Sequence, residues 1–251
     1  MSNLLLVTGS SGIAAATARL ACERGDRVFL IGNHDQECKA FCEHFTNAGY
    51  ALADVRDEEA VANAVSQCLV RFGAIDGLFN VAGLSARSLG DGPLHECSTE
   101  AWSTLMDVHA RGTFFVSRNV LQYWMKERRA GTILNVGSVL ARAPESTHFA
   151  THAYAASKGA VESLSLAAAS YYAPFGIRVN VLAPGLVRTP MSARAQSDPA
   201  IQAFIAKKQP IKKDFVEAEE IARIAYFLLS PESFPMTGEV IRADAGWAVT
   251  G

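Results

Sequence analysis

Three residues of the chain have the types and spacing of a proton-transfer site: Ser138, Tyr154 and Lys158. Ser138 follows an apolar run in NVGSVLARAP, and Tyr154 precedes Lys158 by four positions in HAYAASKGAV. Residues i and i+4 share one face of a helix, so the lysine ammonium can lie near the tyrosine phenol. A nearby cation favours the phenolate, which would lower the tyrosine pKa from about 10 toward the working range of a general acid/base. The pattern therefore predicts acid/base chemistry at Tyr154.

A glycine-rich turn near the start of the chain predicts the binding of a phosphate group. The stretch VTGSSGIAAATARL has the pattern of a strand, a turn and an alanine-rich helix. Gly9 and Gly12 permit a tight turn with close backbone approach, and the N–H groups that begin the helix suit a pyrophosphate. An ordinary strand-to-helix turn would use the same residue types. The strand–turn–helix context favours a dinucleotide.

Strand-like and helix-like segments alternate along the whole chain, and they must position these residues. The strand candidates are LLLVTG, RVFLIG, YALADV, IDGLFNVAG, GTILNVGS, IRVNVLAPG and EVIRADAG. The helix candidates are residues 13–24, 35–47, 57–72, 98–128, 152–175 and 217–229. Repeated strand–helix units predict parallel strands joined by right-handed crossovers. We therefore expect an α/β fold with a single doubly wound domain over residues 1–251, a parallel sheet of about seven strands, and helices on both faces.

The residues at the ends of the second and third strands bear on cofactor choice. In such a sheet the ligand lies beyond the carboxyl ends of the strands, where an acid would bind the adenosine ribose and an arginine a 2′-phosphate. Here the second strand is followed by Asn33 and His34. Asp54 follows the third strand and could meet the adenine amino group or cap a helix. Because no arginine or lysine occupies position 33 or the glycine turn, we expect a mild preference for NAD over NADP.

Size, composition and charge exclude several classes of protein. The chain has 251 residues, of which 49% are hydrophobic and 19% charged, as in an ordinary soluble globular protein. Its formal net charge of -2 and the absence of a basic run argue against a nucleic-acid partner. The first apolar run, LLLV, is too short for a signal peptide or a membrane span. No membrane association is expected.

Cysteine usage points to a reducing compartment. The chain has 5 cysteines, an odd number that argues against a disulfide framework and favours the cytoplasm. Cys38, Cys42 and His44 lie close together, but their spacing fits no common zinc pattern. Cys38 and Cys42 instead suit one buried face of a helix. No metal site is expected.

The motifs together resemble the classical short-chain dehydrogenase/reductase family, from about Leu4 to Trp247. The matching stretches are TGSSGIA, ADV, NVAG, GS, YAASK, NVLAPGLVRTP and TGEVIRADAGW, in the family's order and near its spacing. The resemblance implies a Rossmann-type fold, a nicotinamide cofactor and commonly a homotetramer. The implied reaction is reversible hydride transfer between a secondary alcohol and a ketone, with NAD slightly preferred or NADP as cofactor.

The resemblance also implies a role for each matching residue. Tyr154 looks like the catalytic acid/base, Lys158 like the residue that lowers its pKa and binds the nicotinamide ribose, and Ser138 like the partner of the substrate oxygen. His109 stands where the family commonly has a catalytic asparagine that helps to hold a water between the lysine and solvent. It is a candidate proton relay, with a buried structural imidazole as the alternative. The residues expected to bind the cofactor are Gly9, Ser11, Gly12, Ile13, Asn33, Asp54, Val55, Asn80, Ala82, Gly83, Tyr154, Lys158, Pro184, Gly185, Val187 and Thr189.

Substrate identity is the least determined property. The segment VLARAPESTHFAT and a lid at about 190–215 are expected to enclose a small alcohol or ketone. Ala141, Ala143 and Phe149 would form an apolar wall, and Arg142 could meet an anionic group. Two alternative functions stay open: an epimerase or dehydratase of the same family that uses a bound cofactor, and a catalytically silent dinucleotide sensor.

Overall fold

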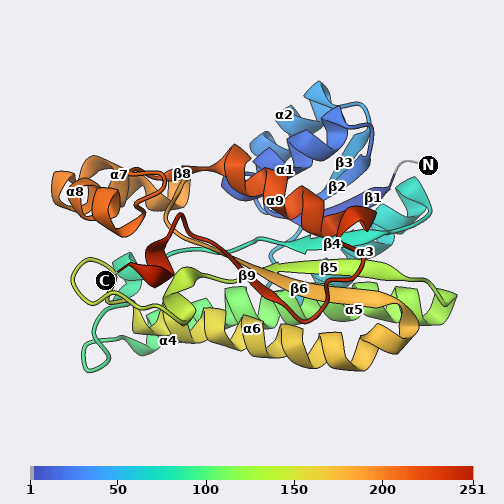
Figure 1. Ribbon diagram of the computed structural model, residues 1–251. Helices are drawn as coiled ribbons and strands as arrows, with labels where there is room; N and C mark the ends of the chain where they lie inside the picture. The colour runs from blue at the N-terminus through green and yellow to red at the C-terminus, as the bar shows by residue number, and fades with distance from the viewer. Residues whose placement is uncertain (1–2, 251) are drawn as a thin grey trace.

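The central feature of the structure is a sheet of seven parallel strands, seen in a computed structural model that describes residues 3–250 (Figure 1). The strands are β1 (Leu4–Thr8), β2 (Arg27–Gly32), β3 (Ala48–Leu52), β4 (Gly77–Asn80), β5 (Gly131–Val136), β6 (Ile177–Pro184) and β9 (Val240–Ala243). Their order across the sheet is β3-β2-β1-β4-β5-β6-β9, and every neighbouring pair is parallel. The predicted doubly wound α/β fold is confirmed.

Helices cover both faces of the sheet because strand side chains alternate between two apolar layers. In β1, Leu5 and Val7 pack in the layer of α1, α2 and α9, whereas Leu4 and Leu6 pack in the layer of α3, α5 and α6. Figure 1 shows α1, α2 and α9 above the sheet and α4, α5 and α6 below it. The helices are α1 (Gly12–Glu23), α2 (Asp35–His44), α3 (Glu58–Phe72), α4 (Thr99–Leu105), α5 (Gly112–Glu127), α6 (His152–Tyr172) and α9 (Ala218–Leu229).

The long helical stretch predicted over residues 98–128 is interrupted by a wider turn. A π-helical segment, Met106–Arg111, joins α4 to α5 and carries His109. Such segments widen the helix locally and occur frequently at functional sites. The apolar periodicity predicted the extent of the helix but gave no sign of this change in pitch.

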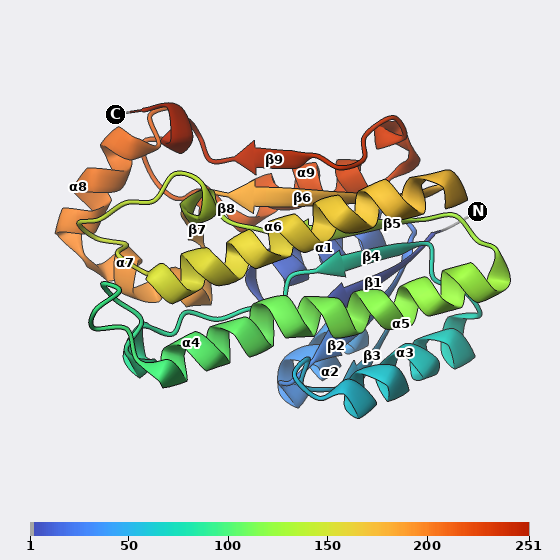
Figure 2. The same ribbon diagram turned by 90° about the horizontal axis from the view of Figure 1, so that it is seen from below.

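The segment predicted as a lid, residues 190–215, contains two helices that the sequence pattern did not predict. These are α7 (Ala193–Ser197) and α8 (Pro199–Lys208), and they lie between two short strands, β7 (Val187–Arg188) and β8 (Val216–Glu217), that pair with each other. In Figure 2 the arrows of β1, β4, β6 and β9 point toward the end of the molecule where α7 and α8 lie. The segment therefore sits beside the carboxyl ends of the sheet.

The third strand differs from its predicted position. It begins at Ala48 rather than Tyr50 and ends at Leu52. Its partner β2 fixes these limits, because Val28 pairs with Ala48 and Gly32, the last residue of β2, pairs with Leu52.

Among residues 3–250 no helix combines the length and apolar character that crossing a membrane requires.

Candidate active site

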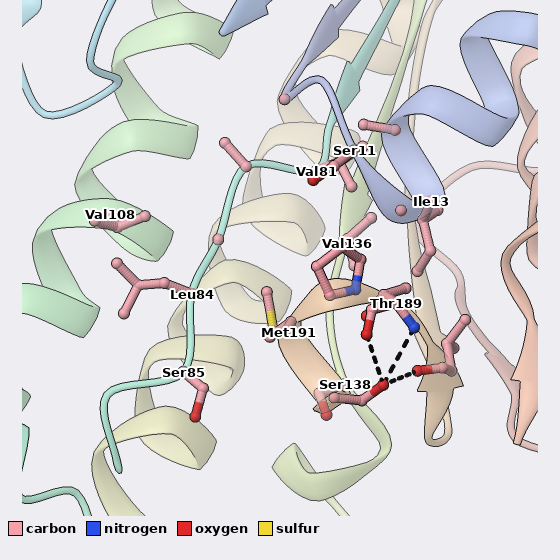
Figure 3. A pocket seen from close by; sticks show the side chains of 18 of the residues that line it. Ser11, Ile13, Val81, Leu84, Ser85, Val108, Val136, Ser138, Thr189 and Met191 are labelled. Atoms are coloured by element: carbon pink, nitrogen blue, oxygen red, sulfur yellow. Dashed lines mark hydrogen bonds between the residues drawn. The ribbon is translucent and has the colours of Figure 1, made fainter. Parts of the chain in front are cut away.

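A cleft of about 550 Å³ opens at the carboxyl ends of the strands. Thr8, Gly32, Val136 and Pro184, the last residues of β1, β2, β5 and β6, all line it. Figure 3 shows Leu84 and Ser85, on the segment that follows β4, across from Thr189 and Met191. Segments far apart in the sequence thus meet at one edge of the sheet, as a doubly wound fold requires.

The glycine turn after β1 forms a cradle that fits a pyrophosphate. Gly9 and Gly12 have φ angles of 101° and 52°, a region that residues with a side chain rarely adopt. A Cβ atom at Gly12 would approach Cγ2 of Thr189 to 3.0 Å, so the space above the turn depends on glycine. Ser11, the N-cap of α1, makes no side-chain capping bond, which leaves the first N–H groups of the helix without a side-chain acceptor. These donors suit an anion.

The next segment of cleft wall is tied to this turn by Thr8. Its Oγ1 accepts hydrogen bonds from the backbone N–H groups of Val81 and Ala82 at 2.9 and 3.0 Å. These bonds hold the segment that follows β4 beside the end of β1. The strand order reverses between β1 and β4, and ligands bind at this switch point in doubly wound folds.

At the end of the cleft where the sequence predicts the adenosine, the Asp54 carboxylate pairs with Arg56. Its Oδ1 accepts from the Arg56 backbone N–H at 2.9 Å, and its Oδ2 accepts from Arg56 Nη2 at 2.6 Å. Arg56 also lowers the pKa of the Asp54 carboxyl. The helix-cap alternative for Asp54 is wrong, because Asp57 caps α3 by accepting from the N–H groups of Glu59 and Ala60.

Ser138, Tyr154 and Lys158 come together in the cleft, as the spacing of Tyr154 and Lys158 and the family resemblance predicted. Ser138 follows β5, and its hydroxyl accepts a hydrogen bond from the Leu140 N–H at 3.2 Å. Lys158 is buried on α6, where Nζ donates to the Val136 carbonyl at 2.9 Å and lies 5.8 Å from the centre of the Tyr154 ring. The end of β5 therefore positions both the serine and the lysine.

Burial dominates the acid/base properties of this group. It raises the pKa of Tyr154, with the Ser138 hydroxyl acting weakly in the opposite direction, and it lowers the pKa of Lys158 to about 8. In this structure burial therefore holds the pKa of the Tyr154 phenol above its ordinary value. The lowering of this pKa by Lys158 stays a prediction, and the ammonium is bound to the Val136 carbonyl.

An acid that the sequence did not single out fixes the start of α6. Asp91 is buried, and its two carboxylate oxygens accept from the N–H groups of Ala153 and Tyr154 at 3.0 and 3.1 Å. Thr151, the N-cap by position, makes no capping bond. An acid at a helix N-terminus is favourable, so Asp91 both stabilises α6 and sets the position of Tyr154.

His109 is buried behind the cleft wall and does not line the cleft. The Leu84 N–H donates to its Nε2 at 3.1 Å, and its Nδ1 lies 2.8 Å from Ser157 Oγ. Because Nε2 accepts, the neutral ring carries its proton on Nδ1 and donates it to Ser157. Ser157 in turn donates to the Tyr154 carbonyl at 2.8 Å. The imidazole thus connects the cleft wall at Leu84 to the helix that carries Tyr154.

Asn80 is the one predicted cofactor residue that does not line the cleft. Its Nδ2 donates to Asn135 Oδ1 at 2.8 Å and to Ser117 Oγ at 3.0 Å. These buried bonds join the end of β4 to β5 and α5. The expected direct contact with the adenosine is corrected to a role in holding the strand ends together.

The predicted wall of the substrate region is only partly correct. Phe149 lines the cleft, but Ala141, Ala143 and Arg142 do not. Arg142 Nε donates to Glu162 at 2.5 Å instead, so the expectation that Arg142 meets an anionic group is wrong. Leu140, from the predicted wall segment, and Met191 and Arg194, from the predicted lid, also line the cleft. Sequence reasoning missed Leu84, Arg87 and Val108, which no motif marks as cleft residues.

Comparison with known proteins places the whole chain among dehydrogenases and reductases. Residues 7–248 match the family model described as Enoyl-(Acyl carrier protein) reductase. The chain is 34% identical to cis-4-hydroxycyclohexanecarboxylate dehydrogenase of Sinomonas cyclohexanicum, over 96% of this chain and 95% of that protein. It is 39% identical to inactive 2-(S)-hydroxypropyl-CoM dehydrogenase 2 of Xanthobacter autotrophicus, over 91% and 98%.

A solved structure gives the same result in three dimensions. Actinorhodin polyketide ketoreductase, crystallised as a variant with NADPH, superimposes with a TM-score of 0.89 and 28% sequence identity. The match covers 99% of this chain and 98% of that one. Fold and sequence comparisons therefore agree over nearly the full length.

The neutral His109 ring predicts a pH-dependent stability. Burial and the Lys158 ammonium hold its pKa well below 6.5 in the folded protein. Between that value and 6.5 the unfolded chain binds a proton that the folded chain does not, so the free energy of unfolding falls as pH falls below 6.5. At pH 5.5, one unit below the reference pKa of about 6.5, the expected loss from this group is on the order of 1 kcal/mol.

The measurement is urea unfolding of the wild type and His109→Asn at pH 5.5 and 7.5. We expect the variant to lose less stability than the wild type between the two pH values. His95→Asn, which changes an exposed histidine, is the matched control and should follow the wild type. Equal pH dependence in the wild type and His109→Asn would contradict the assignment of a buried neutral ring.

Proposed function

The chain belongs to the short-chain dehydrogenase/reductase family, and we propose that it interconverts a secondary alcohol and a ketone by hydride transfer with NAD(P). The observation that carries the proposal is the meeting of Ser138, Tyr154 and Lys158 in the cleft that also contains the glycine turn. The turn fits the pyrophosphate of a dinucleotide. The three side chains are those that proton transfer to or from a substrate oxygen needs.

The protein residues would divide the proton chemistry between them. When bound, the nicotinamide supplies the hydride donor or acceptor. As a ketone is reduced, the Tyr154 phenol would give its proton to the substrate oxygen while Ser138 stabilises charge on that oxygen; in the oxidation of an alcohol, the phenolate form of Tyr154 would take that proton back. Lys158, held by the Val136 carbonyl, places a positive charge near the phenol when it is protonated.

We further propose that the alcohol is carried on an apolar, alicyclic body. The support is twofold: the chain resembles a dehydrogenase of a hydroxycyclohexane compound, and an aromatic wall lines the cleft. In this wall the rings of Phe149 and Trp247 lie 5.7 Å apart, and Phe204 packs against both. Flat aromatic surfaces suit an apolar ring.

A catalytically silent dinucleotide-binding protein is the second candidate. It is favoured by the 39% identity to a relative named as inactive. The complete set of Ser138, Tyr154 and Lys158 argues against it, and turnover of any secondary alcohol would exclude it.

Substitution of the proposed acid/base tests the mechanism. Tyr154→Phe removes the proton carrier but no phosphate contact, so kcat is expected to fall at least about 100-fold. The dissociation constant for the cofactor should stay within about twofold, because the phenol contributes little to binding the pyrophosphate. Tyr171→Phe, an exposed tyrosine of the same helix, is the control. Retention of a tenth of wild-type turnover by Tyr154→Phe would show that the mechanism is wrong.

The preference between cofactors is the next prediction. Arg56, the arginine at the adenosine end, is already paired with Asp54, and Ser10 donates to the Glu37 carboxylate at 2.6 Å. We propose that this end of the cleft favours NAD over NADP by less than about tenfold, since among residues 3–250 the cleft lining there offers no unpaired arginine or lysine to a 2′-phosphate. Dissociation constants for both cofactors measure it, and Asn33→Arg should shift the preference toward NADP. Tighter binding of NADP by the wild type would overturn the prediction.

A homotetramer is proposed for the assembly. Support comes from apolar side chains on the outer surfaces of α5 and α6, where Phe114 and Leu166 are each 39% exposed, and from the small residues of segment 159–169. Figure 2 shows α5 and α6 side by side on one face. Light scattering at micromolar concentration should give four times the mass of the chain, and Leu166→Glu should reduce it. A monomeric mass for the wild type would contradict the proposal.

The relay role of His109 stays a prediction. Both of its ring nitrogens are already bonded, to Leu84 and Ser157, so a proton could pass through the ring only if one of these bonds opened. A positioning role needs no such opening. Alcohol oxidation by His109→Leu across pH 6 to 9 separates the two: a relay requires a slower reaction in this variant than in His109→Asn.

A further inference from the structure

Arg87 and Arg194 converge on one point of the cleft wall. Arg87 lies on the short turn after β4, and Arg194 lies on α7. Their Nη1 and Nη2 atoms donate to the same acceptor, the backbone carbonyl of His148, at 3.2 and 3.3 Å. Both side chains line the cleft. Two guanidinium groups from distant parts of the chain therefore share a single neutral oxygen.

Neither arginine has an acidic partner within 4.0 Å among residues 3–250. The carboxylates of the neighbouring loops accept hydrogen bonds from backbone N–H groups instead. Asp91 accepts from the start of α6, and Glu145 accepts from the backbone N–H groups of Thr147, His148 and Phe149. Burial and the charge of Arg194 lower the pKa of Arg87, and the carboxylate of Asp91 acts in the opposite direction without pairing with either guanidinium. Guanidinium groups in this setting bind oxyanions strongly.

We propose that Arg87 and Arg194 bind an acidic group of the substrate, a carboxylate or a phosphate. The inference rests on the proposed function and names the class of substrate that the site takes. Each arginine has free N–H donors beyond the one given to His148, and a planar fork of donors matches a carboxylate or phosphate.

A phosphate of the cofactor is a poor candidate for this position. The pyrophosphate cradle follows β1, and the adenosine end is formed by segments after β2 and β3. Arg87, His148 and Arg194 follow β4, β5 and β6, on the other side of the switch point in the strand order β3-β2-β1-β4-β5-β6-β9. Arg87 and Arg194 therefore belong to the half of the cleft that contains Ser138 and Tyr154.

The surroundings of the pair define the rest of the ligand. The Arg194 guanidinium carbon lies 6.0 Å from the centre of the Phe149 ring, which packs on Phe204 and Trp247. The cleft thus combines an acid/base tyrosine, an apolar wall and a cationic end. This combination fits a hydroxy acid or keto acid whose charged group is separated from the reacting carbon by an apolar body.

Binding of unreactive probes to the NAD-loaded protein tests the proposal without turnover. The probes are cyclohexanecarboxylate, cyclohexylphosphonate and the neutral cyclohexanecarboxamide, with dissociation constants from calorimetry. At least one anion should bind about tenfold more tightly than the amide, and the tighter anion identifies the class. Arg87→Gln and Arg194→Gln should each remove most of this difference, while Arg87→Lys should retain part of it. Arg223→Gln, on the exposed side of α9, is the matched control and should change nothing.

Equal binding of both anions and the amide by the wild type would overturn the proposal.

A second experiment measures the steady-state reduction of 4-oxocyclohexanecarboxylate and of its carboxamide. Arg87→Gln should raise KM for the acid about tenfold and leave kcat/KM for the amide nearly unchanged. An equal loss on both would show that Arg87 only supports the loop, which would also overturn the proposal. Absence of turnover with any ketone or alcohol would instead refute the proposed function, and the binding arm would still decide the role of the arginines.

Discussion

Burial of a parallel sheet on both faces is the constraint on which the rest of this structure depends. Parallel neighbours cannot be joined by tight hairpins, so each strand is followed by a crossover that packs on one face or the other. Every strand then ends at the same edge. The glycine turn after β1, Ser138 after β5 and Pro184 at the end of β6 share one cleft for this reason, although they are far apart in the chain.

A buried polar network connects the sheet to the helix that carries the chemistry. Asn80 donates to Asn135, which donates to Ser165 of α6, and His109 bonds Ser157 of the same helix. Breaking one of these bonds would leave a buried donor or acceptor unpaired, at a cost of about 1–3 kcal/mol. The network therefore restricts the rotation and sliding of α6 against β4 and β5. Asp91 fixes the N-terminal end of the same helix, and together these contacts hold Tyr154 and Lys158 in the cleft.

Periodicity and short motifs in the sequence predicted the strands of the sheet and the main residues of the candidate site. Apolar runs predicted the seven strands, the four-residue spacing predicted that Tyr154 and Lys158 share a helix face, and the family resemblance predicted that Ser138 meets them. The sequence could not predict contacts that exist only after folding: Asp91 reaches α6 across 62 and 63 positions, and His109 finds its partners across 25 and 48. The raised pKa of Tyr154 was missed for a related reason, because burial at a cleft wall is not visible in a four-residue spacing.

The distribution of charge along the cleft matters more than the net charge of the chain. A formal charge of -2 argues against a polyanion as partner, yet it says nothing about a single small anion. At the end formed by the segments after β2 and β3, Arg56 pairs with Asp54 and the Ser10 hydroxyl donates to Glu37. At the substrate end Arg87 and Arg194 share one carbonyl oxygen. Because a cleft with apolar walls strengthens the field of such a pair, two side chains can select an acidic substrate in a protein that is acidic overall.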